Sequence, residues 1–109
     1  MFSKLTPEQK WTATDYAGIE RNLLRQNDAG GRTSLVRLAK GSRFPTHEHH
    51  GTEEVLVIKG SVIISGITLR ENDYLFTEPG ERHDVQAVED SVIYVASQKA
   101  TPIIEKENT

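Results

Sequence analysis

The sequence predicts an all-β domain. After Gly18 the chain consists of short runs rich in β-branched and aromatic residues, separated by turns of Gly, Pro, Asn and Asp. This pattern is typical of a β-sandwich or a β-barrel. Helical periodicity is hard to find beyond that point. The length of 109 residues fits one domain with its own core, so we expect a single domain without a separate catalytic module.

The N-terminal segment is expected to contain one helical turn. Thr6 fits a helix N-cap, Pro7 fits the first helical position, and Gln9 lies three residues after the cap. Together they can satisfy the unpaired N–H groups of a helix start. We expect three parts: an N-terminal segment (residues 1–18) that packs on the barrel or is exchanged with a second copy, a barrel (19–98), and a polar C-terminal tail (99–109).

The β-rich runs give eight expected strands. Short turn signals such as Lys59-Gly60 and Glu89-Asp90 link several of them. The expected strands are residues 19–26, 33–38, 46–50, 53–58, 61–65, 74–77, 83–88 and 91–96. After them, Ile103-Ile104 is the apolar part of the tail, which we expect to form an edge segment and a loose end.

Two of the expected strands are apolar on both faces. Neither Val55-Leu56-Val57-Ile58 nor Val62-Ile63-Ile64 alternates between apolar and polar residues. Both faces of these strands therefore need to be covered. Because a domain of this size has few other elements to cover them, we expect a homodimer.

Composition and charge exclude several classes of partner. The formal net charge is -3 and the sequence pI is about 5.8, so there is no basic surface for nucleic acid or for anionic lipid. No run of apolar residues approaches the length of a membrane span, and no signal peptide is evident. The chain has no cysteine, which fits a reducing compartment. We expect a cytoplasmic protein that binds neither nucleic acid nor membranes.

The histidines form a constellation suited to a metal ion. His47 and His49 are two residues apart, so on a strand their side chains point to the same face. A tight turn at Gly51-Thr52 would bring Glu53 back beside them, and His83 can supply a third nitrogen if the sheet closes. Three imidazoles and one carboxylate suit one divalent transition ion, with positions left for water or substrate.

Each part of this constellation has a simpler interpretation when taken alone. A His-x-His pair on a strand is more often a surface or packing feature than a ligand pair, and Glu53-Glu54 is typical of a solvated strand start. However, all four histidines lie in the constellation or next to it. Strand parity turns His50 away from the others. The complete spacing favours metal binding.

The spacing resembles the first motif of the cupin superfamily. Gly41, five residues, His47, one residue, His49, three residues, Glu53, six residues and Gly60 match that motif at every fixed position. The second cupin motif is only partly met. The interval from Pro79 to His83 is one residue shorter than usual, Asn72-Asp73 stands where Gly-Asp is common, and Ala87 replaces an Asn. The resemblance implies a cupin double-stranded β-helix, or jelly-roll barrel, with His47, His49, Glu53 and His83 as ligands.

Within the cupins, the chain resembles the ChrR-type subgroup from about Trp11 to Ala96. The resemblance rests on the short Pro79–His83 interval, on residues 33–38 and on residues 53–57. One member of that subgroup uses the domain as the sensory half of a zinc anti-sigma factor. The helical half that binds sigma factor is not found in this sequence, so we expect a free-standing metal-binding cupin.

Two function classes follow from these observations. The first is a divalent-metal-binding module that binds or senses a small polar or anionic ligand, since an ion held by one carboxylate keeps a net positive charge in an apolar barrel. The second is a metal-dependent dioxygenase or isomerase acting on a small carbonyl compound. The ligands do not choose among zinc, iron, nickel and manganese, and no catalytic residue or organic cofactor is indicated.

Four further residues are possible pocket positions. Phe44, Phe76 and Tyr94 could line a pocket and Arg37 could pair with an anion. Core packing for the aromatic residues and a solvated face for Arg37 are the alternative interpretations.

Overall fold

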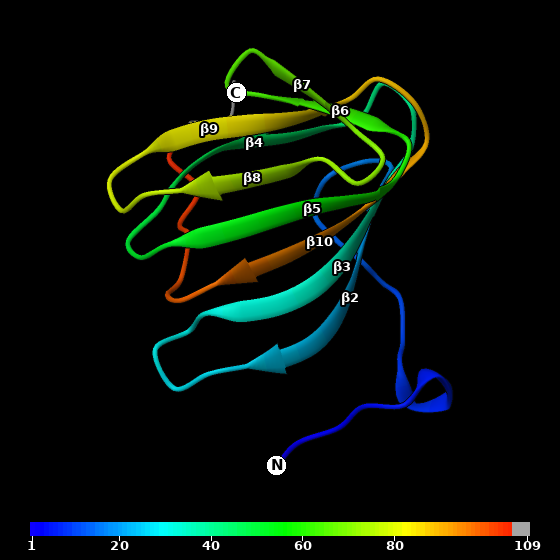
Figure 1. Cartoon of the computed structure of the whole chain (residues 1–109), viewed down its shortest axis with the longest axis vertical. Helices are drawn as coiled ribbons and strands as arrows, with labels where there is room; N and C mark the ends of the chain where they lie inside the picture. The colour runs from blue at the N-terminus through cyan, green and yellow to red at the C-terminus, as the bar shows by residue number, and fades with distance from the viewer. Residues whose placement is uncertain (106–109) are drawn as a thin grey trace.

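The computed structural model describes residues 1–105 and places ten strands in two antiparallel sheets (Figure 1). The elements are a 3-10 turn η1 (Thr6–Glu8) and the strands β1 (Thr12–Ala13), β2 (Ile19–Gln26), β3 (Arg32–Leu38), β4 (Arg43–Glu48), β5 (Glu53–Lys59), β6 (Ser61–Ile64), β7 (Ile67–Arg70), β8 (Tyr74–Thr77), β9 (Arg82–Ala87) and β10 (Ser91–Ser97). None of the helical structure in these residues is long or apolar enough to cross a bilayer.

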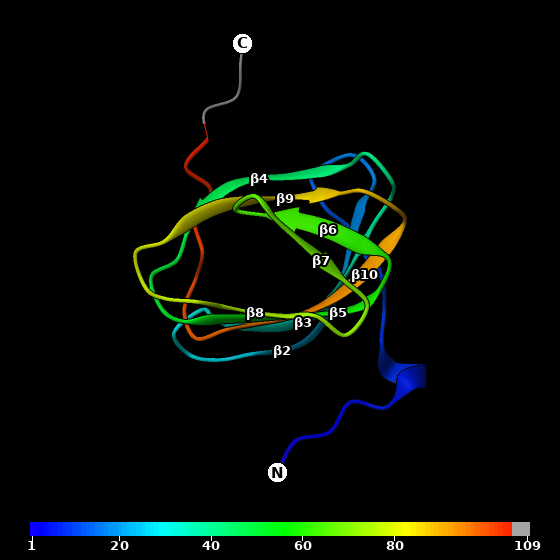
Figure 2. The same ribbon diagram turned by 45° about the horizontal axis from the view of Figure 1, so that its top comes forward.

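The two sheets form the facing walls of the barrel, as Figure 2 shows. The larger sheet has the strand order β1-β2-β3-β10-β5-β8, and the smaller sheet has the order β4-β9-β6-β7. From β4 onward the chain crosses repeatedly between the sheets, so strands distant in sequence become neighbours. This is the expected all-β cupin jelly roll, and the expected N-terminal helical turn is present as η1.

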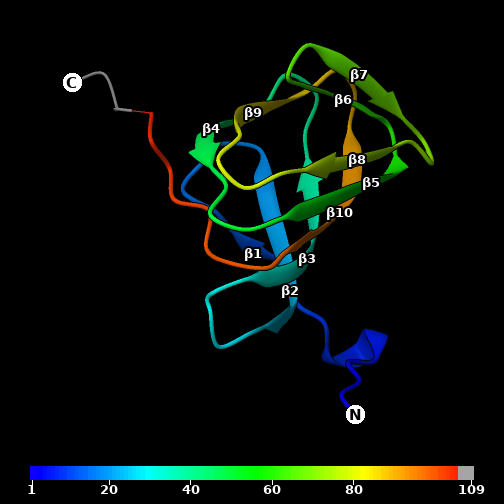
Figure 3. The same cartoon turned by 60° about the vertical axis from the view of Figure 1, so that its left-hand side comes forward.

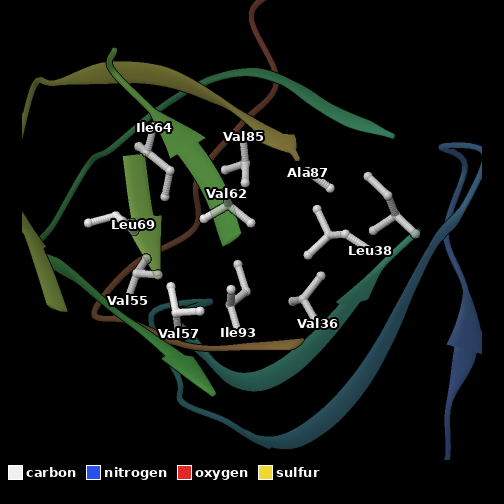
Figure 4. Packing of buried hydrophobic residues seen from close by; sticks show 11 residues of the cluster. Val36, Leu38, Val55, Val57, Val62, Ile64, Leu69, Val85, Ala87 and Ile93 are labelled. Carbon is white, nitrogen blue, oxygen red and sulfur yellow. The ribbon is translucent and has the colours of Figure 1, made fainter. Parts of the chain in front are cut away.

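The core lies between the sheets and is built by alternation along the strands (Figure 4). On β5, Val55 and Val57 are buried, whereas Ile58 is 45% exposed on the outer face. The inward positions form one cluster: Ile19, Val36, Leu38, Val55, Val57, Val62, Ile64, Leu69, Val85, Ala87 and Ile93. The strand that reads as apolar on both faces therefore contributes only one of its faces to the core of its own chain.

The expected strands differ from the observed ones mainly in the smaller sheet. Residues 19–26 and 74–77 agree at both ends, but β4 begins at Arg43 and ends at Glu48, where residues 46–50 were expected. Strands β1 and β7 were not expected. The turn before β7 has positive φ at both Ser65 (51°) and Gly66 (75°). Those angles suit a tight type I′ hairpin, which pairs β6 with β7.

The N-terminal segment packs against β2 and β3 of its own barrel. The Lys4 ammonium donates a hydrogen bond to the Leu23 carbonyl (2.8 Å), and Asn22 donates one to Gln9 (3.0 Å). The cap of η1 is Leu5, so the prediction that Thr6 is the cap was wrong. The Leu5 N–H donates to the Glu8 carboxylate (2.9 Å), which makes a hydroxyl at the cap unnecessary. Exchange of this segment between copies stays a prediction.

The described part of the C-terminal segment runs beside β4 (Figure 3). The Glu48 N–H donates to the Pro102 carbonyl (3.0 Å), and the Ile104 N–H donates to the Thr46 carbonyl (3.1 Å). Arg43 forms an ion pair with Glu105 (2.7 Å). The segment therefore adds an edge to the barrel, as expected. The rest of the expected loose end, residues 106–109, lies outside the described residues.

Candidate metal centre

Four buried side chains converge between the two sheets. His47 comes from β4, His49 from the turn after it, Glu53 from the start of β5 and His83 from β9. Their ligand atoms all lie within 4.8 Å of one another. The structure thus brings together all four residues that the sequence indicated as metal ligands.

Local strand geometry explains how these side chains meet. His47 and His83 are direct cross-strand partners on β4 and β9, so their rings share one face of the small sheet. The turn after β4 is held by backbone hydrogen bonds from His49 N–H to Glu81 (3.0 Å) and from Gly80 N–H to His49 (2.7 Å). Because of these two hydrogen bonds, the His49 side chain still points inward although it lies beyond the end of β4.

The residues next to the ligands point elsewhere. Glu54 is exposed on the outer face and accepts a hydrogen bond from the Tyr74 hydroxyl (2.7 Å). His50 is exposed and lies 3.6 Å from the Glu48 carboxylate. Both are therefore separated from the centre, as strand parity predicts.

Backbone carbonyls fix which ring nitrogens can act as ligands. His47 Nδ1–H donates to the Pro45 carbonyl (3.0 Å), and His49 Nδ1–H donates to the Glu81 carbonyl (2.8 Å). Because a carbonyl can only accept, the proton of each neutral ring is on Nδ1. In this neutral form each Nε2 carries a lone pair that could bind a metal, for His49 in place of its 3.1 Å contact with Glu53 Oε1, and the hydrogen bond at Nδ1 holds the ring in place.

Burial keeps two of the three imidazoles neutral. It lowers the pKa of His47, and together with the nearby His47 and His49 rings it lowers the pKa of His83 to about 4. Burial also acts to lower the pKa of His49, but hydrogen bonds to Glu53 and to the Glu81 carbonyl outweigh it and raise that pKa. At neutral pH His47 and His83 thus offer nitrogen lone pairs, whereas the surroundings of His49 favour a positive charge.

The donor set fits a divalent transition ion. His49 Nε2 lies 3.1 Å from Glu53 Oε1, and His83 Nε2 lies 3.8 Å from the same oxygen. Among the described residues, the buried His83 Nε2 has no hydrogen-bond partner. An unpaired nitrogen next to a buried carboxylate is costly unless a cation lies between them. Three nitrogens and one oxygen suit zinc, iron, nickel or manganese.

A cavity of about 580 Å³ opens beside the centre. His47 and Glu53 form part of its wall, and Phe44 packs edge-on against His47 with ring centroids 5.3 Å apart. Its apolar wall is made of side chains from both sheets: Val36, Leu38, Val55, Val85, Ile93 and Val95. A volume of this size can hold a small organic molecule.

Of the four predicted pocket residues, the structure places Phe44 in this wall and the other three on the outside of the large sheet. Arg37 forms an exposed ion pair with Glu20 (2.9 Å). Phe76 is paired with Glu54, and Tyr94 lies between two other outward residues of β3 and β5. The reason is strand parity. On β3, β8 and β10 the side chains that point inward belong to the sequence neighbours of Arg37, Phe76 and Tyr94, so these three side chains point outward.

Sequence reasoning missed two arginines in the cavity wall. Arg21 and Arg32 both line it. The signal was the alternation in β3, where Ser34, Val36 and Leu38 are buried. Since Arg32 has the same parity, it faces the same side of the sheet.

Comparison with known proteins identifies the family. A family model described as the ChrR cupin-like domain matches residues 3–102. The chain belongs to the ChrR cupin-like family. In this cupin, the motif glycine Gly60 has a backbone role: its φ is +84°, and a Cβ there would clash with the Asp90 carbonyl oxygen. Ala87, at the position where the second motif usually has Asn, is a core residue.

This cupin is similar to proteins of different descriptions. It is 32% identical over 69 residues to an Arabidopsis thaliana DNA damage-repair/toleration protein, a match that takes in 58% of this chain and about a fifth (22%) of that protein's length. An acetylacetone dioxygenase from Acinetobacter johnsonii superposes with a TM-score of 0.81 and 20% identity, covering 96% of this chain and 77% of that one. The Rhodobacter sphaeroides complex of SigE with the anti-sigma ChrR gives a TM-score of 0.74 and 18% identity, covering 87% and 52%. At these identities the solved structures show a shared fold.

Proposed function

We propose that this cupin holds one divalent transition-metal ion on His47, His49, Glu53 and His83 and uses it to bind a small polar or anionic ligand. The observation that carries the proposal is the convergence of four buried ligand atoms within 4.8 Å, one of them the unpaired Nε2 of His83. A bound ion would supply a positive charge and open coordination positions for a ligand oxygen.

The protein's own residues would orient such a ligand. The carbonyls of Pro45 and Glu81 hold two of the rings with Nε2 toward the centre. Phe44 packs edge-on against one of these rings and shields it from solvent on that side. The apolar wall of the cavity would contact the ligand's hydrocarbon part, so that polar groups gather at the ion.

A metal-dependent dioxygenase or isomerase for a small carbonyl compound is the second candidate. It is supported by the likeness to an acetylacetone dioxygenase over 96% of this chain and by a cavity large enough for such a substrate. Both candidates need the same metal centre. They differ in whether a bound carbonyl compound is converted.

One reconstitution experiment separates the two candidates. The metal content of protein purified from its native host is measured first, and metal-free protein is then loaded anaerobically with ferrous iron or zinc. A binding module should retain its ion and gain thermal stability with ligands, without consuming O₂. A dioxygenase should consume O₂ only with a β-diketone, an α-keto acid or a catechol, and His83→Ala should abolish that uptake. Absence of a stoichiometric metal would contradict both candidates.

We also propose that a second copy covers the outer face of the large sheet. Ile58, Tyr74 and Phe76 are exposed by 45%, 54% and 46%, and they lie on the neighbouring strands β5 and β8. A group of large apolar side chains on one open sheet face is typical of a protein interface. Sedimentation at micromolar concentration should give a dimer, and Ile58→Glu should give a monomer, whereas a monomeric wild-type protein would contradict the proposal.

A further inference from the structure

The cavity has a second chemical feature besides the metal centre. Arg21 of β2 and Arg32 of β3 both belong to its wall. In the large sheet Glu53 is paired with Ser97, and the Ser97 hydroxyl accepts a hydrogen bond from the Arg32 N–H (3.0 Å). Arg32 therefore starts two strands away from Glu53, about 10 Å at the usual strand spacing. The two arginines thus share one cavity wall with His47 and Glu53, two of the four candidate ligands.

Neither guanidinium has a counter-ion in residues 1–105. The ion pairs found there for other arginines join Arg37 to Glu20, Arg43 to Asp84 and Glu105, and Arg82 to Glu48. Arg21 is half-buried, and burial together with the charge of Arg32 lowers its pKa. Two cations in one cavity wall, neither of them in an ion pair, are favourable partners for an anion that enters the cavity.

A third polar group in the wall also lacks a partner. Ser34 follows Arg32 by two residues, so it faces the same side of β3. It is 3% exposed, and its hydroxyl has no hydrogen-bond partner among the described residues. A buried hydroxyl in this position is a donor that a small rearrangement around a bound ligand would satisfy.

We propose that the cavity binds a small carboxylic acid whose carboxylate lies between Arg21 and Arg32 while an oxo or hydroxy group points toward the metal centre. The metal-facing half of this inference rests on the proposed function. Guanidinium groups match the planar carboxylate with paired hydrogen bonds. The valines, Ile93 and Phe44 of the wall suit a short hydrocarbon chain between the two polar ends.

The charges of the cavity wall favour a carboxylate over a phosphate. Asp15 also lines the cavity, although it forms no ion pair with either arginine. Together Asp15, Arg21 and Arg32 contribute about one net positive charge to the cavity wall, which matches a monoanion better than a doubly charged phosphate.

The test compares acids with their methyl esters. Calorimetric titrations of zinc-loaded and metal-free protein would use oxo acids of four to six carbons, the corresponding methyl esters and inorganic phosphate. The wild-type protein should bind the best acid at least about tenfold more tightly than its ester. Arg32→Gln and Arg21→Gln should remove this preference. Arg37→Gln is the matched control on the outer face and should retain it.

The outcomes separate the inference from the proposed function. If acids and esters bind equally, if phosphate binds more tightly than every acid, or if Arg37→Gln loses as much preference as Arg32→Gln, the inference is wrong. Unchanged zinc content in these variants would show that their effect is not loss of the metal. If zinc fails to bind but the acid preference persists, the proposed metal function fails and the arginine site stands. Because Arg32 is exposed, its variant keeps the test valid should Arg21→Gln fail to fold.

Discussion

The two ends of the barrel interior are equally buried and chemically opposite. On β5 the inward residues run from Glu53 to Val57, and on β9 they run from His83 to Ala87. In both strands the inward side chains change from polar to apolar over four positions, a distance of about 13 Å. Glu53, Val57, His83 and Ala87 are each at most 6% exposed. Burial alone therefore does not distinguish the metal end from the apolar end.

The difference lies in what each end needs. At the apolar end, aliphatic side chains are satisfied by contact with one another, so burial itself is stabilising. At the metal end, polar atoms need a partner, and His83 Nε2 has none among the described residues. The comparison indicates that the apolar end stabilises the fold while the metal end is arranged for a ligand.

The largest expected effect is loss of the metal in His49→Ala. Removing one of four ligands should weaken binding of zinc at least about 100-fold, because three protein donors hold the ion poorly. Competition with a chromophoric chelator measures the affinity. His50→Ala, which changes an exposed neighbour, should bind zinc normally. Full occupancy in His49→Ala would show that the ligand assignment is wrong.

Next in size is a change at the apolar end. Ile64→Ala should lower the free energy of unfolding by about 2–5 kcal/mol, because Ile64 is fully buried and its truncation leaves a cavity. Urea denaturation of metal-free protein measures this. Ile67→Ala, at a position 49% exposed on the next strand, should change stability by less than about 0.5 kcal/mol. A loss of zinc stoichiometry in folded Ile64→Ala protein would argue against a division between the two ends.

Removing the metal should have a somewhat smaller effect on stability. An ion that binds only the folded state at 100 times its Kd contributes about 2.7 kcal/mol. For a chain of this length, that corresponds to a fall in Tm of about 10–20 °C on chelation. Scanning calorimetry with and without chelator measures the difference. The same chelator should leave the Tm of His49→Ala unchanged, and an equal fall there would place the ion elsewhere.

The smallest effect separates two adjacent carboxylates. Glu53→Gln keeps the side-chain shape but removes the charge at the centre, so it should weaken zinc binding by about tenfold or more. Glu54→Gln changes an exposed residue that hydrogen-bonds Tyr74 and should alter the affinity less than about twofold. Chelator competition on both proteins gives the ranking. The reverse ranking would move the carboxylate ligand to the outer face.

Much of the fold and the centre was predictable because it depends on local rules. Strand parity placed His47 and His49 together and turned Glu54 away, and motif spacing added His83. The second strand of the β6–β7 hairpin was missed because its turn, Ser65-Gly66, is a weaker signal than Asn-Gly. The N-cap was misplaced because Glu8 satisfies the Leu5 N–H by itself.

The pocket was less predictable because parity says which residues share a face but not which face is inside. In β3 the buried set could have been either Ser34 and Val36 or Leu35 and Arg37. We chose Arg37, and the structure places it outside. Only the pairing of β3 with β2 and β10 settles the question, and those contacts join residues far apart in sequence.

The C-terminal segment beside β4 has a consequence for the order of assembly during protein synthesis. Residues 100–103 line the cavity, and they leave the ribosome after every metal ligand and after both cavity arginines. Emerging chain can therefore bring the four ligands together while one side of the cavity is still open. A metal ion that binds this centre would then have an open route of entry, which residues 102–104 would narrow when they pair with Thr46 and Glu48.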